Sequence, residues 1–179
     1  MRSRHSTLTF LLLSVLCAPP ARAENEYGVK AAYLFNFAKF IEWPKSAFAS
    51  ASAPVVVGIV GRDPFGAELD RAFSDATVNG RPVEIRRVGA GDAAGLRACH
   101  LLFVPATEEA RTDAILAAVQ GKPVAVVGES DDFARRGGVL GFVRDGGNVK
   151  FDANAKAAAR NGMSISAKLL RVARRVVEG

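Results

Sequence analysis

The chain has 179 residues with a formal net charge of +6, and Arg2, Arg4 and Arg22 account for half of that charge. The 156 residues that follow position 23 carry 21 basic and 18 acidic side chains, a net +3, which is too little to favour nucleic acid as a partner. They suffice for one domain with its own core but not for two, and their single cysteine excludes an internal disulfide.

The first 23 residues have the pattern of a secretory signal peptide. Arg2 and Arg4 precede an apolar run at residues 8–17, and residues 21–23 (ARA) form the small-x-small motif that signal peptidase accepts. The apolar run is about half as long as a membrane span, and no later run approaches 18 apolar residues. The pattern therefore predicts export across a bacterial inner membrane.

We expect cleavage after Ala23, which leaves a mature periplasmic domain of residues 24–179 without a membrane span. The alternative is a lipoprotein attached through Cys17. Leu16, the residue before that cysteine, is larger than lipoprotein processing prefers, so the cleaved signal peptide is the favoured interpretation.

Residues 27–43 predict an amphipathic helix that Pro44 ends. Apolar residues repeat at helical spacing on two adjacent faces, the first with Val29, Tyr33, Phe37 and Phe40, the second with Leu34, Ala38 and Ile41. Such a broad aromatic arc is either buried on both sides within one domain or covered on one side by another chain.

Three apolar runs predict buried strands, at residues 55–61, 101–104 and 123–128, and residues 83–88 (VEIRRV) predict a further strand with an alternating start. The turn signal at Asn79-Gly80 precedes this further strand. Strand and helix alternate along this part of the chain. The alternation predicts a doubly wound, mostly parallel α/β sheet of the flavodoxin or Rossmann type.

Two helices are predicted between these strands. Asp63-Pro64 has the pattern of an N-cap and first helical residue, ahead of a short helix with Phe65, Leu69 and Phe73 on its apolar side. Thr107 is the expected cap of the next helix, and Gly121 its expected end.

The C-terminal part follows a different pattern. Residues 138–154 predict an antiparallel hairpin about the Gly146-Gly147 turn, closing one edge of the sheet. A last helix is expected from Ser164 onward. Its apolar face contains Ile165, Leu169, Val172 and Val176.

The residues give no basis for catalysis or for a cofactor or metal. Cys99 and His100 are neighbours at the start of a strand, where alternate side chains point to opposite faces, so they are poorly placed as a catalytic pair. Cys99 is either a small buried residue, which we favour, or a thiol that pairs with another chain. The glycine-rich turn at residues 58–66 matches neither GxGxxG nor a P-loop. We expect a binding protein and no enzyme.

Four segments together resemble the YfiR family: YGVKAAYLFNFAKFIEWP at 27–44, VGIVGRDPFGAEL at 57–69, CHLLFVPATEE at 99–109, and the stretch from GVLGFVRDGGNVKFDANA to LLRVA at 138–173. The resemblance spans essentially the whole mature chain. It implies a periplasmic repressor that binds the periplasmic domain of an inner-membrane diguanylate cyclase, lowers cyclic di-GMP signalling and restrains biofilm formation. It also implies an outer-membrane lipoprotein that can sequester the repressor, and a homodimer. Relatives carry several disulfide-forming cysteines, so their redox control does not extend to a chain with only Cys99.

Six residues are candidates for partner binding. Arg62 and Phe65 lie in the turn after the first strand, and Asn154 and Arg160 follow the hairpin. Leu34 and Ile41 represent the broad, aromatic-rich apolar arc of the first helix, which is the preferred contact. Asn154 has an alternative role as a helix cap and Phe65 as a core residue. The competing function is a periplasmic sensor of a small molecule, with its pocket at the carboxyl ends of the strands.

Overall fold

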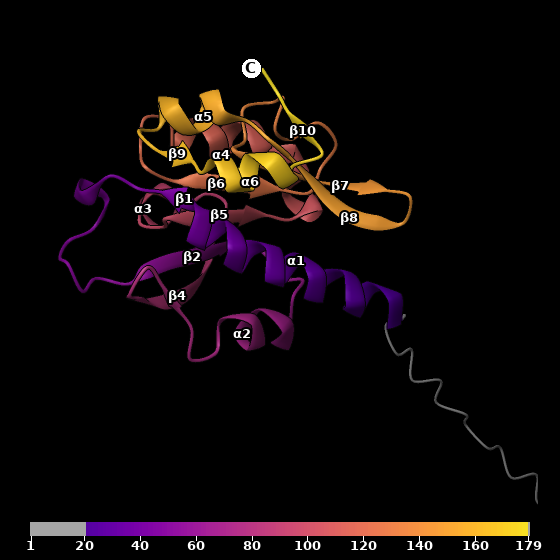
Figure 1. Ribbon diagram of the computed structural model, residues 1–179, viewed down its shortest axis with the longest axis horizontal. Coiled ribbons are helices and arrows are strands. Elements are labelled where there is room, and N and C mark those ends of the chain that lie inside the picture. Colours follow the sequence, from indigo (N-terminus) through magenta and orange to yellow (C-terminus); the bar gives the residue numbers. More distant parts are fainter. Residues whose placement is uncertain (1–20, 179) are drawn as a thin grey trace, which may run out of the picture.

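The computed structural model describes residues 21–178, and side chains from Glu26 onward (Figure 1). Most of the predicted signal peptide lies outside the described residues. The principal helices are α1 (Ala21–Phe40), α2 (Ala67–Phe73), α3 (Ala93–Arg97), α4 (Thr112–Ala118), α5 (Ala155–Arg160) and α6 (Ala167–Val172), with short 3-10 turns η1 (Lys45–Ala47) and η2 (Ala106–Arg111). The strands are β1 (Ile41–Glu42), β2 (Val55–Val60), β3 (Thr77–Val78), β4 (Arg81–Val88), β5 (Leu101–Val104), β6 (Ala125–Gly128), β7 (Leu140–Asp145), β8 (Asn148–Ala153), β9 (Ser164–Ile165) and β10 (Arg175–Val176).

The main sheet has eight strands in the order β10-β8-β7-β6-β5-β2-β4-β3. Its central strands β4, β2, β5, β6 and β7 are parallel, whereas β7–β8 and β3–β4 are antiparallel. This confirms the predicted α/β class with a mostly parallel sheet. The chain builds outward from β2, first to β4 and then to β5 on the other side, as in doubly wound folds.

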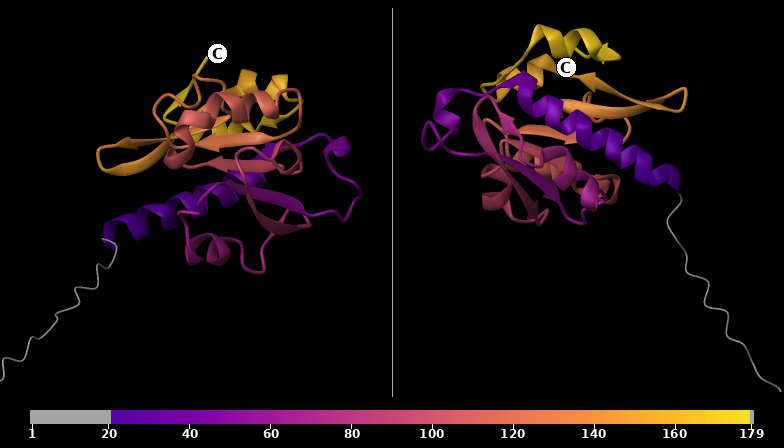
Figure 2. Two further views of the ribbon diagram at one scale, coloured as in Figure 1. Left: turned by 180° about the vertical axis from the view of Figure 1, so that it is seen from behind. Right: turned by 60° about the horizontal axis from the view of Figure 1, so that its bottom comes forward.

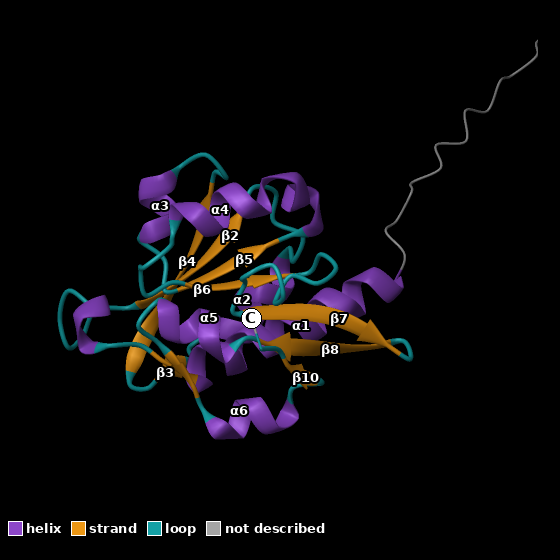
Figure 3. Ribbon diagram, turned by 90° about the horizontal axis from the view of Figure 1, so that it is seen from above, coloured by secondary structure: helices purple, strands orange, loops and turns teal. Residues whose placement is uncertain are grey.

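The two faces of the sheet carry separate cores. Val57 of β2 packs into a core with residues of α1, α2, α5 and α6, while Val56 packs into a second core with residues of α3 and α4. Figure 3 shows α3 and α4 on one side of the sheet and α1 and α6 on the other. All six residues of β2 are buried, as a strand covered on both faces requires.

The first helix runs diagonally across its face of the sheet (Figure 2). It ends at Phe40, earlier than the predicted end at Pro44, because Ile41 and Glu42 pair as β1 with β9. The backbone N–H of Ser166 donates to the Phe40 carbonyl at 2.9 Å and fixes this exit. The broad apolar arc is explained within the domain, since its second face lies entirely in the core.

Two predicted caps differ in the structure. The Asp63 carboxylate accepts from the Phe65 N–H at 2.8 Å and closes a turn, and α2 begins only after Gly66, which has a positive φ of 55°. Thr107 makes no capping hydrogen bond, because it lies inside η2, and α4 starts later at Thr112. Thus both loops are longer than local signals indicated.

The C-terminal expectations need two corrections. The hairpin β7–β8 forms as predicted about Gly146-Gly147, but it is not the edge of the sheet, because β10 pairs in parallel with β8. The prediction of one long last helix is wrong. Only residues 167–172 are helical, and Val172 and Val176 are 66% and 46% exposed rather than on a buried face.

Candidate functional site

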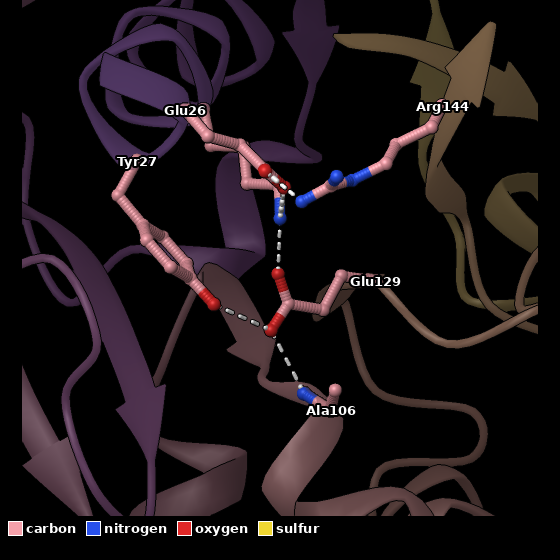
Figure 4. Close-up of polar contacts among 6 residues, drawn as sticks. Glu26, Tyr27, Ala106, Glu129 and Arg144 are labelled. Carbon is pink, nitrogen blue, oxygen red and sulfur yellow. Dashed lines mark hydrogen bonds and ion pairs between the residues drawn. The ribbon is translucent and has the colours of Figure 1, made fainter. Parts of the chain in front are cut away.

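The carboxyl ends of the parallel strands β5 and β6 meet the N-terminal half of α1, and a buried ionic cluster lies at this junction. Glu129 directly follows β6, and Ala106 follows β5 and Pro105. Tyr27 and Lys30 reach the same point from α1 (Figure 4). In doubly wound folds this edge is the usual location of binding sites. Here part of it is filled by the protein's own first helix.

Glu129 is the centre of the cluster. Its carboxylate accepts hydrogen bonds from the Tyr27 hydroxyl at 3.1 Å and from the Ala106 N–H at 2.9 Å, and it pairs with the Lys30 ammonium. Lys30 is 5% exposed and makes a second ion pair with Glu26, with 2.7 Å between Nζ and Oε1. Glu26 in turn pairs with Arg144 of β7. The cluster therefore connects α1 to the ends of β5 and β6 and to β7.

The cluster keeps the Tyr27 hydroxyl protonated. Burial, reinforced by the charge of Glu129 and the hydrogen bond to it, raises the pKa of Tyr27 well above its ordinary range. Tyr27 therefore remains a phenol that donates its proton to Glu129. The Lys30 ammonium also lies 4.6 Å from the centre of the Tyr27 ring, a distance typical of a cation–π contact. We call this cluster, which consists of Glu26, Tyr27, Lys30, Glu129 and Arg144, the latch, because its contacts hold α1 against the strands.

A cleft of about 520 Å³ opens beside this latch. Its lining combines an apolar floor with side chains of both charges: Phe142, Val143 and Val149, the acidic Glu26, Glu129, Asp131 and Asp132, and the basic Lys30, Arg144 and Arg174. Arg174 is held by a two-pronged pair with Asp152, at 2.8 and 2.6 Å. The cleft thus lies between α1, the β7–β8 hairpin and the C-terminal segment.

Three of the six residues proposed from sequence for partner binding are core or capping residues. Leu34 and Ile41 are fully buried against the sheet, so neither is accessible to a partner in this conformation. Asn154 is also fully buried. Its side chain accepts from the Ala157 N–H at 2.8 Å as the N-cap of α5 and donates to the Ala134 carbonyl at 2.7 Å.

The other three lie in different places. Phe65 is buried, and its ring packs edge-on against Tyr27 and Phe103 at centroid distances of 5.3 and 4.8 Å, so it supports the latch. Arg62 and Arg160 are both exposed. Arg62 follows β2 at the carboxyl edge of the sheet, whereas Arg160 lines a second cleft near the start of β6, at the amino edge. The six residues therefore do not form one surface.

Sequence reasoning missed Lys30 and Glu129. A signal for each was present, because Lys30 stands on the helical stripe of Leu34 and Phe37, where a lysine is out of place, and Glu129 directly follows a fully apolar strand. Their pairing was not predictable, since they are 99 positions apart in sequence.

Cys99 and His100 have structural roles on opposite faces of the sheet. Cys99 is a free, buried thiol, and burial raises its pKa to about 11. His100 accepts from the Val56 N–H at Nδ1, 3.0 Å away, and its Nε2 lies 3.0 Å from the Ala47 carbonyl, which makes it the donor there. Its ring stacks on Phe48. Neither residue is available as a nucleophile or base.

Within residues 21–178, no group of three or more His, Cys, Asp or Glu side chains is placed to hold a metal ion. No helix in that part of the chain combines the length and apolar character that crossing a membrane requires.

A family model described as YfiR/HmsC-like matches residues 27–174. The chain belongs to the YfiR/HmsC-like family. This match confirms the resemblance in the sequence, and it covers α1 from Tyr27 onward, the whole main sheet except β10, and the latch apart from Glu26. The family is periplasmic and regulatory rather than enzymatic, which supports a general role for this chain as a periplasmic regulator.

Two solved structures show the same type of fold at low sequence identity. A conserved domain protein from Vibrio cholerae O1 biovar El Tor is 12% identical with a TM-score of 0.50, over 69% of this chain and 55% of that one. The ABC domain in complex with L-Trp from Streptococcus pneumoniae is 14% identical with a TM-score of 0.58, over 82% of this chain and 60% of the other. This chain thus spans less than two thirds of either protein.

Proposed function

We propose that this YfiR/HmsC-like protein is a periplasmic repressor that binds the periplasmic domain of an inner-membrane diguanylate cyclase and lowers cyclic di-GMP. The observation that carries the proposal is the family match over residues 27–174. A repressor of this kind needs only to bind the inactive state of the cyclase better than the active one. A 100-fold preference, about 2.7 kcal/mol, changes the active fraction substantially.

The carboxyl edge of the sheet is the contact surface that we propose for the cyclase. Arg62 is exposed there and has no ion pair with another described residue, and Val29 of α1 is 38% exposed. The latch holds the N-terminal half of α1 in place beside them. This revises the expectation from sequence, in which Leu34 and Ile41 supplied the contact. An outer-membrane lipoprotein that competes for the same edge would release the cyclase.

Deletion and complementation test this function. Loss of the gene should raise cellular cyclic di-GMP and surface attachment, and export-competent protein should reverse both. Arg62→Glu should fail to complement, whereas Arg160→Glu, the same exposed substitution at the opposite edge of the sheet, should complement fully. Unchanged cyclic di-GMP after deletion, in cells that express the partner cyclase, would show that the protein is not its repressor.

The cleft beside the latch supports a second candidate function, a sensor of a small molecule. Its apolar floor and its charges of both signs suit a ligand that carries separated positive and negative groups, such as an amino acid. The Streptococcus pneumoniae ABC domain, which shares this type of fold, was solved in complex with an amino acid, L-Trp. Thermal stabilisation by members of a metabolite library, lost in Arg144→Ala, would support the sensor.

A further inference from the structure

The net charge of the mature domain is concentrated at its C-terminal end. Residues 168–179 contain four basic side chains and one acidic side chain, a net charge of +3. Positions 24–179 as a whole carry 21 basic and 18 acidic residues, so subtracting the last twelve positions leaves 17 of each sign in residues 24–167. The excess positive charge therefore lies in one short stretch that contains α6 and β10. We call residues 168–176 the basic segment.

Three of the four cations in the basic segment have no acidic partner. Lys168, Arg171 and Arg175 are exposed, and none of them makes an ion pair with a described residue. The Lys168 ammonium lies over the Phe40 ring, 4.9 Å from its centre. This contact does not neutralise the charge, so all three cations are open to an anion from outside the domain.

The acidic side chains that interact with the basic segment are already neutralised. Asp152 forms its two-pronged pair with Arg174, the fourth cation of the segment. A hydrogen bond from Arg135, reinforced by the charges of Arg135, Arg175 and Arg174, lowers the pKa of Asp132, and Arg135 is the ion-pair partner of Asp132. These carboxylates therefore do not compensate the remaining cations.

The same segment carries the two most exposed large apolar side chains of the described residues. Val172 and Val176 are 66% and 46% exposed, and only Val29, at 38%, joins them in that class. They are four positions apart, so their Cα atoms lie within about 14 Å of each other. A helix face that simply contacts water explains the cations but not these valines, because apolar side chains are more stable away from water.

The basic segment is held to the fold at both ends. Leu169 and Val177 are buried, and the Ser166 hydroxyl accepts from the Leu169 N–H at 3.3 Å. The Val177 N–H donates to the Ala153 carbonyl at 2.8 Å. Figure 3 shows α6 at the margin of the molecule, on the side away from α3 and α4. The backbone thus presents four exposed side chains between two anchored ends: Arg171, Val172, Arg175 and Val176.

We propose that the basic segment is a docking surface for a membrane of anionic phospholipids. Cations beside exposed apolar side chains are typical of protein surfaces that lie on a membrane. Arg171 and Arg175 pair with lipid phosphates, while Val172 and Val176 leave water at the boundary with the acyl chains. Lipid headgroups are mobile and adapt to the spacing that the protein presents. A folded acidic partner would instead need a matching hollow, and none of these four side chains lines the cleft beside the latch or the one near the start of β6.

Vesicle co-sedimentation of residues 24–179 tests the docking surface. The protein should bind vesicles that contain about 30 mol% phosphatidylglycerol in phosphatidylcholine at about 50 mM salt, and about 500 mM salt should release it, because salt screens exposed charges. Vesicles of phosphatidylcholine alone should bind at least about tenfold less protein, since they offer no net negative charge.

Reversing charges in the basic segment should abolish most of the binding. Lys168→Glu with Arg171→Glu should lower the partition coefficient at least about 25-fold, because each cation near an anionic surface contributes about fivefold. The matched control is Lys156→Glu with Arg160→Glu on α5. It changes one exposed lysine and one exposed arginine on a helix of equal length, and neither makes an ion pair with a described residue. The control should lower the coefficient by less than about fivefold.

The valines are tested without a change in charge. Val172→Ser with Val176→Ser should lower the partition coefficient about fivefold, because less apolar surface leaves water on docking. Circular dichroism and urea unfolding establish that each variant is folded, and the salt and lipid dependence of the native protein needs no variant.

Four results would overturn the proposal: no binding of native protein to the anionic vesicles, equal binding to phosphatidylcholine alone, equal losses in the two charge-reversed variants, or no loss in the valine variant. Charge reversal that weakens binding to a periplasmic cyclase domain, with no vesicle binding by the native protein, would assign the segment to an acidic protein partner instead. The vesicles contain no cyclase, so their result is independent of the proposed repression.

Discussion

Individual residues show how the protein stabilises charge inside its core. Lys30 and Glu129 are both nearly inaccessible, yet each has more than one partner, and this multiplicity offsets the cost of removing charge from water. Removing Lys30 leaves the Glu129 carboxylate buried without a cation, although its hydrogen bonds from Tyr27 and Ala106 persist. The consequence is testable by a double-mutant cycle.

Lys30→Met should lower the free energy of unfolding by about 3–5 kcal/mol, because it leaves the Glu129 carboxylate buried without its cation. Adding Glu129→Gln should restore most of the loss, since the amide oxygen still accepts from Tyr27 and Ala106. Urea unfolding of the four proteins gives the coupling energy. Additive losses would show that the two residues do not act as a pair.

His100 predicts a specific pH dependence. Burial lowers its pKa below the ordinary 6.5, while in the unfolded chain the ordinary value applies. Below pH 6.5 the unfolded chain binds a proton that the folded protein does not, so the free energy of unfolding falls as pH decreases through this window, by at most about 1.4 kcal/mol per pH unit. His100→Gln, which retains a donor and an acceptor, should flatten the curve between pH 5 and 6.5. Equal slopes for both proteins would contradict this assignment.

At the scale of elements, the sequence predicts a helix or a strand correctly where a single hydrophobic periodicity dominates. The fully apolar runs of β2 and β5 specify strands that are buried on both faces, and Gly146-Gly147 specifies a hairpin. The C-terminal segment was mispredicted because its apolar spacing fits a helix and its decisive contacts are distant. Arg174 donates its backbone N–H to the Phe151 carbonyl at 2.8 Å and its guanidinium to Asp152, and these contacts divert the chain into β10. The latch escaped prediction for the same reason, since no local pattern links Lys30 to Glu129.

The Arg174–Asp152 pair should stabilise β10 measurably. Arg174→Lys keeps the charge but loses the two-pronged geometry, so we expect the protein to lose about 1–2 kcal/mol of stability. Arg175→Lys, at the exposed neighbouring position, should change it by less than about 0.5 kcal/mol. Hydrogen exchange at Val177, whose N–H donates to Ala153, should accelerate in the first variant only. Equal effects of the two substitutions would assign no stabilising role to the pair.

For the whole molecule, export and processing remain predictions. Helix α1 begins at Ala21 and so passes through the expected cleavage site after Ala23. Cleavage there leaves every member of the latch in the mature protein, because the first of them is Glu26. Mass spectrometry and N-terminal sequencing of periplasmic protein should show a chain that begins at Glu24. A lipid-modified chain that begins at Cys17 would show instead that the protein is a lipoprotein.

Helix α1 depends on packing partners that lie far along the chain. The Phe37 ring contacts Phe142 and Phe151 at centroid distances of 5.6 and 4.9 Å, and Lys30 needs Glu129, so the first helix packs on strands from the last third of the chain. Such contacts of large sequence separation form late, because a long loop must close first. A chain that crosses the membrane N-terminus first therefore delivers α1 to the periplasm without its packing partners. If the chain is exported as predicted, we therefore expect its native core to be completed only after the β7–β8 hairpin has followed.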